Sequence, residues 1–299
     1  MKTEKNSSIL DKSKAVYQTL TQGFMDNIIL WEGSTRPIAL IRIGIVFLLL
    51  ARFASELLPF SKPTLFLVLT GLSFFLSTLL MLLGFWTQFA TAWTGANLVW
   101  LYLVAGPILI GGTGFKHHHT YLLVAITCLL ALTPCGRSYS LDRVLALWKA
   151  KKQNLPLPLE IGPLWATLLI GLQASMVYFW GAFDKTNWGF LSGSRMEHLY
   201  ILYYSRSSDY PSFPGFSFLM FVLATATVVL EYVLAFFLWV ERFQKWLIPL
   251  AIGFQLVIYY TLPVSTFSLT MCLLFLIYLD PDKAHRFIDE LQGITPKET

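Results

Sequence analysis

The residue best placed for acid–base chemistry is Lys185, which lies directly after a long apolar run. The run extends from residue 161 to 183, and Asp184, Lys185 and, shortly after, Trp188 follow it. A lysine at such a boundary is either an anchor whose amine reaches the polar surface or a base whose charged form is disfavoured by apolar walls. Tryptophan beside lysine is typical of the anchor, and a neighbouring carboxylate favours the charged amine. The residues alone leave both interpretations open.

A second group of side chains with acid–base potential is the run His117-His118-His119. Successive helical residues lie about 100° apart, so the three rings cannot all face one side. Metal ligands would need wider spacing, and no Asp, Glu or Cys lies nearby, so we predict no metal. His119, the one nearest the following apolar segment, is either an interfacial residue or an acid–base and substrate-positioning group.

Four charged side chains fall within apolar segments: Arg42, Arg52, Glu56 and Glu231. Each unpaired charge inside a membrane costs several kcal/mol, roughly 3 on insertion scales, so we expect partners. Arg52 and Glu56 have the i, i+4 spacing of a helical ion pair. Arg42 and Glu231 have no local partner, and we predict that they neutralise each other as a buried structural pair. A direct part in chemistry is the alternative for these two.

The composition indicates that a membrane surrounds most of this chain. Of its residues, 56% are hydrophobic and only 13% are charged, against about 25% charged in a typical soluble domain. The apolar residues occur in long blocks, as membrane spans require. The net charge is +5. In a membrane protein, basic residues chiefly set the orientation of the chain in the membrane, so we predict no nucleic-acid partner. The odd count of three cysteines implies no disulfide framework.

The blocks predict an all-α fold, a polytopic transmembrane bundle of about eight segments. The last two segments meet at Pro263 and form either two short spans or a re-entrant hairpin. The predicted spans are residues 39–58, 64–85, 89–111, 120–134, 161–183, 216–240, 246–262 and 264–279.

Basic residues give this layout an orientation. With the N-terminus inside, 15 lysines and arginines fall on the inner side and 5 on the outer side. This bias follows the positive-inside rule. We therefore predict both termini in the cytoplasm, most plainly of a bacterial inner membrane, with His119 and Lys185 on the same outer face.

Three regions follow from the layout. Residues 1–30 form a cytoplasmic arm, either solvated or an amphipathic helix; residues 31–282 form the membrane domain; residues 283–299 form a polar tail. Between the fourth and fifth spans, Ser140 is a suitable N-cap for an interfacial helix over residues 141–152.

Two stretches carry a family resemblance. The segment YFWGAFDKTNWGFLSGSRMEHL resembles the signature of the vitamin K-dependent gamma-carboxylase superfamily, also called the HTTM (horizontally transferred transmembrane) domain. The segment KHHHTYLLVAITCLLALTPCGRSYSLD is similar to that family's histidine-led helix, which ends in a Ser-x-Asp element. The matching residues are Tyr178, Gly181, Lys185, Trp188 and Gly193 in the first, and His119, Tyr121, Ser140 and Asp142 in the second.

The resemblance implies a quinol-dependent carboxylase chemistry. Lys185 would be the base that deprotonates a reduced quinone of the vitamin K hydroquinone kind, and His119 would hold or polarise the quinol oxygen. Gln255 stands where the family often has a histidine in its late spans. The side chains implied to contact the quinol are Tyr178, Trp188, Tyr121 and Gln255.

Alternative functions remain on these grounds. The large extracytoplasmic region with which the animal carboxylase grips its protein substrate has no counterpart after Leu279. A non-catalytic membrane partner or maturation factor for a secreted peptide is therefore the second hypothesis, with Lys185 as an anchor. A transporter is least favoured, because the spans show no inverted repeat.

Overall fold

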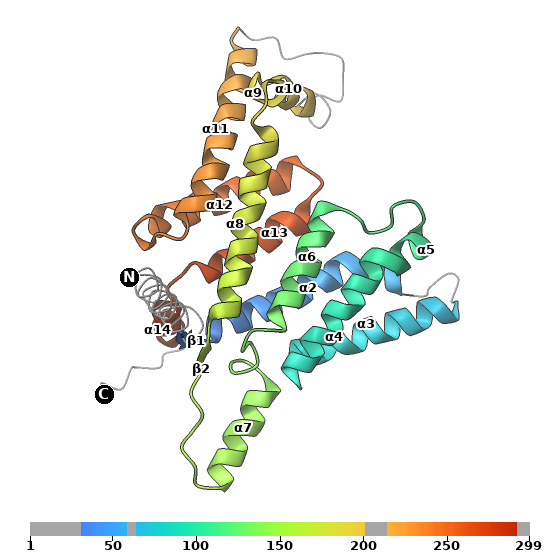
Figure 1. Ribbon diagram of the computed structural model, residues 1–299, viewed down its shortest axis with the longest axis vertical. Helices are drawn as coiled ribbons and strands as arrows, with labels where there is room; N and C mark the ends of the chain where they lie inside the picture. Colours follow the sequence, from blue (N-terminus) through green and yellow to red (C-terminus); the bar gives the residue numbers. More distant parts are fainter. Residues whose placement is uncertain (1–30, 59–63, 201–213, 292–299) are drawn as a thin grey trace, which may run out of the picture.

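The computed structural model describes residues 31–58, 64–200 and 214–291, and these form a helical bundle with one short pair of strands (Figure 1). The predicted arm over residues 1–30 lies outside the described residues. The elements are β1 (Glu32–Ser34), α2 (Arg36–Leu57), α3 (Leu65–Leu83), α4 (Thr87–Trp100), the π-helical turn η2 (Leu101–Ala105), α5 (Gly106–Ile110), α6 (His118–Leu130), α7 (Leu141–Lys152), β2 (Ile161–Pro163), α8 (Trp165–Lys185), α9 (Trp188–Leu191), α10 (Ser194–Tyr200), α11 (Phe216–Phe237), α12 (Glu241–Thr261), α13 (Ser265–Leu274), the 3₁₀ turn η4 (Phe275–Ile277) and α14 (Pro281–Leu291).

Five stretches of helix in the described residues are long and apolar enough to cross a membrane. They coincide with five of the predicted spans, because uninterrupted apolar runs of about 20 residues have no other stable form in lipid. These stretches are α2, α3, the continuous stretch Thr87–Ile110, α8 and α11.

The three remaining predicted spans are helical but fall short by length or composition. The helices that contain His119–Leu130 and Ser265–Ile277 are shorter apolar segments. Helix α12 begins with a charged turn and contains Pro249. It ends at Thr261 and α13 begins at Ser265, so the chain breaks around Pro263 as predicted. Eight crossings therefore stay a prediction.

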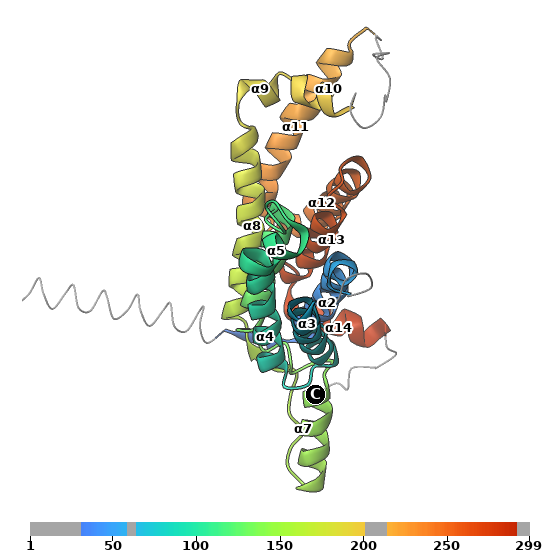
Figure 2. The ribbon, with the colours of Figure 1, turned by 90° about the vertical axis from the view of Figure 1, so that its right-hand side faces the viewer.

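The helices pack in two layers, which Figure 2 shows edge-on. Helices α4 and α8 belong to one layer, with α6 between them in contact with both; α2, α3, α12 and α13 belong to the other. Helix α2 supplies much of the core between the layers. Ile41, Ile45, Leu49 and Phe53 recur every four residues and are fully buried, which keeps them on one face of the helix.

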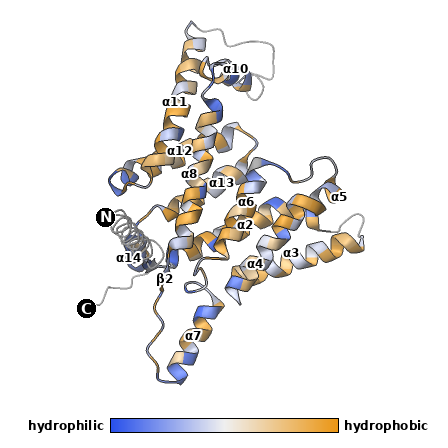
Figure 3. Ribbon diagram, in the orientation of Figure 1, coloured by the Kyte–Doolittle hydropathy of each residue, from blue (hydrophilic) through white to orange (hydrophobic). Residues whose placement is uncertain are grey.

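One end of the bundle gathers β1, β2, α7 and α14 (Figure 1). Strand β1 pairs antiparallel with β2. Arg36 joins them to the last helix: its Nε donates to Glu160 at 2.6 Å and its Nη1 to Asp289 at 2.5 Å. The chain thus enters the described bundle at residue 31 and leaves it at residue 291 from the same end (Figure 1). Figure 3 shows more hydrophilic residues on α7 and α14 than on the long helices.

The predicted helix between the fourth and fifth spans is confirmed as α7. Its bounds are Leu141–Lys152, and the Ser140 hydroxyl accepts a hydrogen bond from the backbone N–H of Arg143 at 2.9 Å. A serine oxygen in this position satisfies one of the donors that every helix leaves free at its start.

Candidate functional site: a lysine–glutamate pair between α8 and α11

Lys185, the last residue of α8, forms an ion pair with Glu231 on α11. Its Nζ donates to Oε1 at 2.7 Å and to Oε2 at 2.8 Å. The Lys185 side chain is 30% exposed, whereas that of Glu231 is only 8% exposed. The pair therefore lies at the edge of the packed interface between the two helices, with the amine as its accessible member.

The predicted pairing of Glu231 with Arg42 is wrong, because Lys185 occupies the carboxylate. Figure 1 shows that α11 begins well beyond the end of α8, so a residue two-thirds of the way along α11 lies level with the last turn of α8. The position of a residue within its own span does not show how far one helix is displaced along its neighbour. Arg42 instead donates through Nη2 to the backbone oxygen of Tyr139, on the chain between α6 and α7.

Gly181, one turn before Lys185, leaves open volume beside the pair. Its backbone oxygen accepts a hydrogen bond from Lys185 Nζ at 3.2 Å. A Cβ at this position would lie 3.5 Å from Nζ and 3.6 Å from both carboxylate oxygens. The glycine therefore keeps the space next to the amine and the carboxylate free of protein atoms.

The end of α8 and the start of α9 carry exposed aromatic rings, and a further polar contact joins α8 to α11. Trp180 and Phe183 on α8 and Trp188 on α9 are exposed. The Thr186 hydroxyl lies 3.1 Å from the Tyr232 hydroxyl, so a second polar contact joins α8 to α11. Sequence reasoning missed Thr186 and Tyr232, although each directly follows one member of the ion pair.

Tyr178 and Gln255, both predicted to contact a quinol, are in contact with each other. Gln255 Nε2 donates to the Tyr178 hydroxyl at 2.9 Å, and both side chains are buried. Gln255 Oε1 has no hydrogen-bond partner among the described residues. Tyr178 precedes Lys185 by seven residues, which places the two on the same face of α8.

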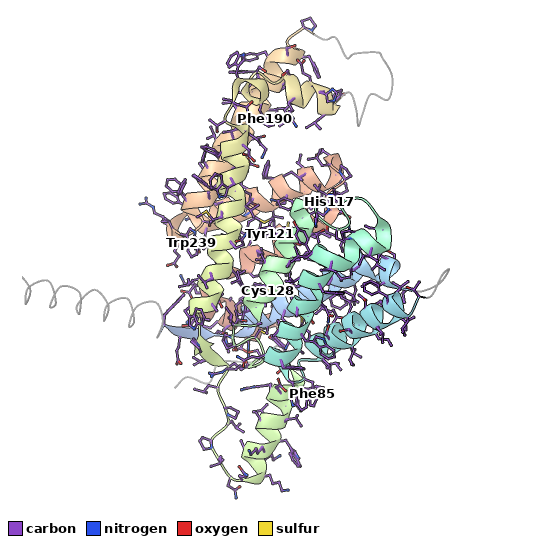
Figure 4. The ribbon with its side chains drawn as sticks, turned by 45° about the vertical axis from the view of Figure 1, so that its right-hand side comes forward. Phe85, His117, Tyr121, Cys128, Phe190 and Trp239 are labelled. Carbon is purple, nitrogen blue, oxygen red and sulfur yellow. The ribbon has the colours of Figure 1, made fainter. Side chains whose placement is uncertain are left out.

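His119 and Tyr121 lie at the start of α6. The His119 ring stacks on His117, with ring centroids 5.4 Å apart, and the ring centroid of Tyr121 is 6.5 Å from that of Tyr102. Figure 4 shows His117 and Tyr121 near the end of α6 that lies away from the β-strands. Within the described chain, Lys185 Nζ bonds only Gly181 and Glu231, so the structure does not bring Lys185 and His119 into direct contact.

The predicted ion pair between Arg52 and Glu56 is not formed in the described part of α2. The Arg52 guanidinium lies 5.4 Å from the ring centroid of Phe53 and 5.2 Å from that of Phe115. The faces of both rings attract the cation, while Glu56 stays exposed. Helical spacing permits a pair but does not select it over aromatic partners.

Arg42 is a fully buried cation. Its Nη2 donates to the backbone oxygen of Tyr139, whereas its Nε and Nη1 have no hydrogen-bond partner among the described residues. Burial raises the pKa of the neighbouring Cys135 thiol, so this thiol stays neutral at pH 7 and cannot balance the charge. Gly84 is needed here, because a Cβ would lie 2.4 Å from Nη1.

The Ser-x-Asp element caps two helices at once. While Ser140 caps α7, the Asp142 carboxylate accepts from Trp86 N at 2.9 Å, Thr87 N at 2.8 Å and the Thr87 hydroxyl at 2.6 Å. These donors belong to the first turn of α4. The element therefore joins α7 to α4, a role that spacing alone did not predict.

Long apolar helices that enclose a lysine–glutamate pair define an integral membrane protein. Residues 47–283 match the HTTM domain, and since this covers most of the chain, the chain belongs to the HTTM domain family. No curated protein and no solved structure matches the chain.

Proposed function

We propose that the Lys185–Glu231 pair is the acid–base site of a membrane enzyme that acts on a lipid-soluble quinol. The observation that carries the proposal is the pair itself, an amine and a carboxylate in hydrogen-bond contact at 2.7 Å, with the amine partly exposed. The resemblance to the gamma-carboxylase superfamily implies the same lysine as base.

The residues around the pair fit a reduced quinone of the vitamin K hydroquinone kind. Gly181 places no side chain against the amine or the carboxylate, and the exposed rings of Trp180, Phe183 and Trp188 give the end of α8 and the start of α9 an apolar surface. Two turns of α8 away from Lys185, the buried Gln255 Oε1 has no hydrogen-bond partner among the described residues and is an acceptor suited to a hydroxyl group. When bound, the quinol supplies an acidic hydroxyl and two transferable electrons.

Lys185 and Glu231 can share the proton chemistry between them. Transfer of a proton from Nζ to the carboxylate leaves a neutral amine and a neutral acid, and an apolar environment penalises a neutral pair less than two separate charges. The neutral amine then accepts a proton from a hydroxyl group held in the Gly181 space. Glu231 holds the displaced proton, so no buried charge is left unpaired.

The test compares Lys185→Arg with Lys185→Ala in purified, folded protein. Arginine keeps the charge but cannot act as a base near neutral pH. We expect both variants to lose turnover of an added reduced menaquinone, followed by chromatography of the quinol and its oxidised products. Lys116→Arg is the matched control, a lysine outside the pair. Full turnover in Lys185→Arg would exclude Lys185 as the base.

A second candidate is a non-catalytic maturation factor for a secreted peptide or protein. The observation that favours it is that all three Nζ hydrogens have acceptors, namely Gly181 O and the two oxygens of Glu231. In this role the pair fastens α8 to α11. The double variant Lys185→Glu with Glu231→Lys would then retain function, because it keeps the ion pair while moving the amine.

For topology, we propose eight crossings, with both termini in the cytoplasm of a bacterium and the chain in its inner membrane. The excess of basic residues on the predicted inner side supports this orientation. The position of residues 31 and 291 at the same end of the bundle (Figure 1) fits an even number of crossings. Labelling of the variants Ala146→Cys and Gly189→Cys with a thiol reagent that does not cross the membrane would test this topology. We expect the two cysteines to be modified from opposite sides.

A further inference from the structure

A large cavity lies far from the ion pair, at the end of the bundle that carries β1, β2 and α7. Its volume is about 1090 Å³. Its walls come from the first turn of α4, the chain between α6 and α7, the start of α7 and the segment that leads into β2. Figures 1 and 4 show the start of α4, marked by Phe85, beside the start of α7.

Two arginines line this cavity, and they differ in how many protein groups they already contact. Arg143 donates to Pro158 O, and its Nε lies 3.7 Å from a Glu160 carboxylate oxygen. Arg137 is exposed, and its one hydrogen bond is to Ile161 O. In the described chain no carboxylate pairs with Arg137, so most of its donors remain available to a ligand.

Two carboxylates also line the cavity, and only one of them is open to a ligand. The Asp142 oxygens already accept three hydrogen bonds from Trp86 and Thr87. Glu32, on β1, also lines the cavity and is exposed. Behind the wall, Arg42 adds a buried positive charge that lies close enough to Asp142 to interact with it electrostatically. Since Glu160 lies against Arg143 and Asp142 is engaged by Trp86 and Thr87, Arg137 is the lining cation that no carboxylate of the described residues pairs with, and an anion would bind beside it.

Apolar side chains from the start of α4 and from the chain after α6 form part of the cavity wall. Trp86, which is 65% exposed, and Phe89, which is 59% exposed, come from the start of the apolar stretch Thr87–Ile110. Leu132, also exposed, follows the end of α6. Tryptophan at such a boundary is typical of the level of lipid headgroups. A ligand that touches both Arg137 and these side chains needs an anionic head and an apolar tail.

We propose that this cavity binds the headgroup of an anionic phospholipid, with the phosphate against Arg137 and Arg143 and the glycerol and upper acyl chains against Trp86, Phe89 and Leu132. Arginine suits this role because its planar fork donates two parallel hydrogen bonds to phosphate oxygens. Glu32, an exposed carboxylate of the same lining, repels the anion. The lipid is bound by residues that take no part in the proposed acid–base chemistry.

The test is a titration of the purified full chain in detergent with short-chain phosphatidylglycerol, phosphatidylcholine and soluble glycerol phosphate. Native mass spectrometry counts bound lipid, and the midpoint of thermal unfolding reports its effect. We expect phosphatidylglycerol alone to bind and to raise the midpoint. Arg137→Gln should weaken its affinity about tenfold, as loss of one charge-assisted contact does. Glu32→Gln should strengthen binding, because it removes the opposing charge.

Lys149→Gln on α7 is the matched control, since it removes one positive charge from the same region but not from the cavity wall. Its affinity for phosphatidylglycerol should equal that of the parent. Equal binding of phosphatidylcholine, or unchanged affinity in both Arg137→Gln and Glu32→Gln, would overturn the proposal. Glycerol phosphate binding as tightly as the lipid would also overturn it, because a soluble phosphate ester would then be the ligand.

Discussion

Lys185 Nζ donates to both carboxylate oxygens of Glu231, at 2.7 and 2.8 Å, across the interface between α8 and α11. The two residues are 46 positions apart in the sequence, and they lie on two different apolar helices. Their contact fixes how far α11 is displaced along α8. The same contact places an amine and a carboxylate beside the space left by Gly181.

Removing one member of this pair should destabilise the protein more than removing both. Glu231→Leu leaves the Lys185 amine at an apolar interface, and we expect a loss of about 2 kcal/mol, reduced from about 3 because the amine is partly exposed. The double variant with Lys185→Met should recover part of this loss. Unfolding in detergent, followed by circular dichroism, measures both. Additive losses would show that the two side chains are not coupled.

Gly181→Ala should lower activity while leaving the fold intact. The added Cβ meets Nζ and the carboxylate oxygens at 3.5–3.6 Å, an ordinary contact distance, so it fills the space by the pair without a clash. Quinol turnover and the unfolding midpoint are the two measurements. Gly253→Ala, in α12 with nothing within 4 Å of its Cβ, is the control. Unchanged turnover in Gly181→Ala would mean that the space is not used.

Gly84→Ala should be among the most damaging single changes. Gly84 has φ +65°, and its Cβ would lie 2.4 Å from both Arg42 Nη1 and Ser140 Cβ. Left-handed strain of roughly 1 kcal/mol adds to overpacking of about 2 kcal/mol. Gly112→Ala separates the two effects, because Gly112 has φ +56° and open space around it. Similar unfolding midpoints for the two variants would contradict the packing argument.

Asp142→Ala should destabilise the start of α4. It removes the acceptor for three hydrogen bonds from Trp86 and Thr87, and loss of a capping carboxylate costs about 1–2 kcal/mol. Hydrogen exchange should accelerate in the first turn of α4 before it changes elsewhere. Asp184→Ala, at an exposed carboxylate, should leave both exchange and midpoint unchanged. Equal effects of the two substitutions would argue against a capping role.

The sequence predicted the parts of this fold that depend on local chemistry. Apolar runs gave the five long stretches of helix, Pro263 marked the break after α12, and Ser140 marked the start of α7. The partners of buried charges were not predictable in this way. Glu231 pairs with Lys185 because α11 is displaced along α8. Arg52 contacts the Phe115 ring because that ring packs beside the face of α2 on which Arg52 lies. Both facts depend on how helices pack, which spacing within one helix does not encode.

The contacts of Arg36 have a consequence for the order of events during synthesis. Arg36 is made early, but its partners Glu160 and Asp289 follow more than a hundred and more than two hundred residues later. Arg36 can therefore form both contacts only after residue 289 has been synthesised. Contacts of such long range form late and slowly. Closure of this end of the bundle thus depends on the return of α14 to the start of α2.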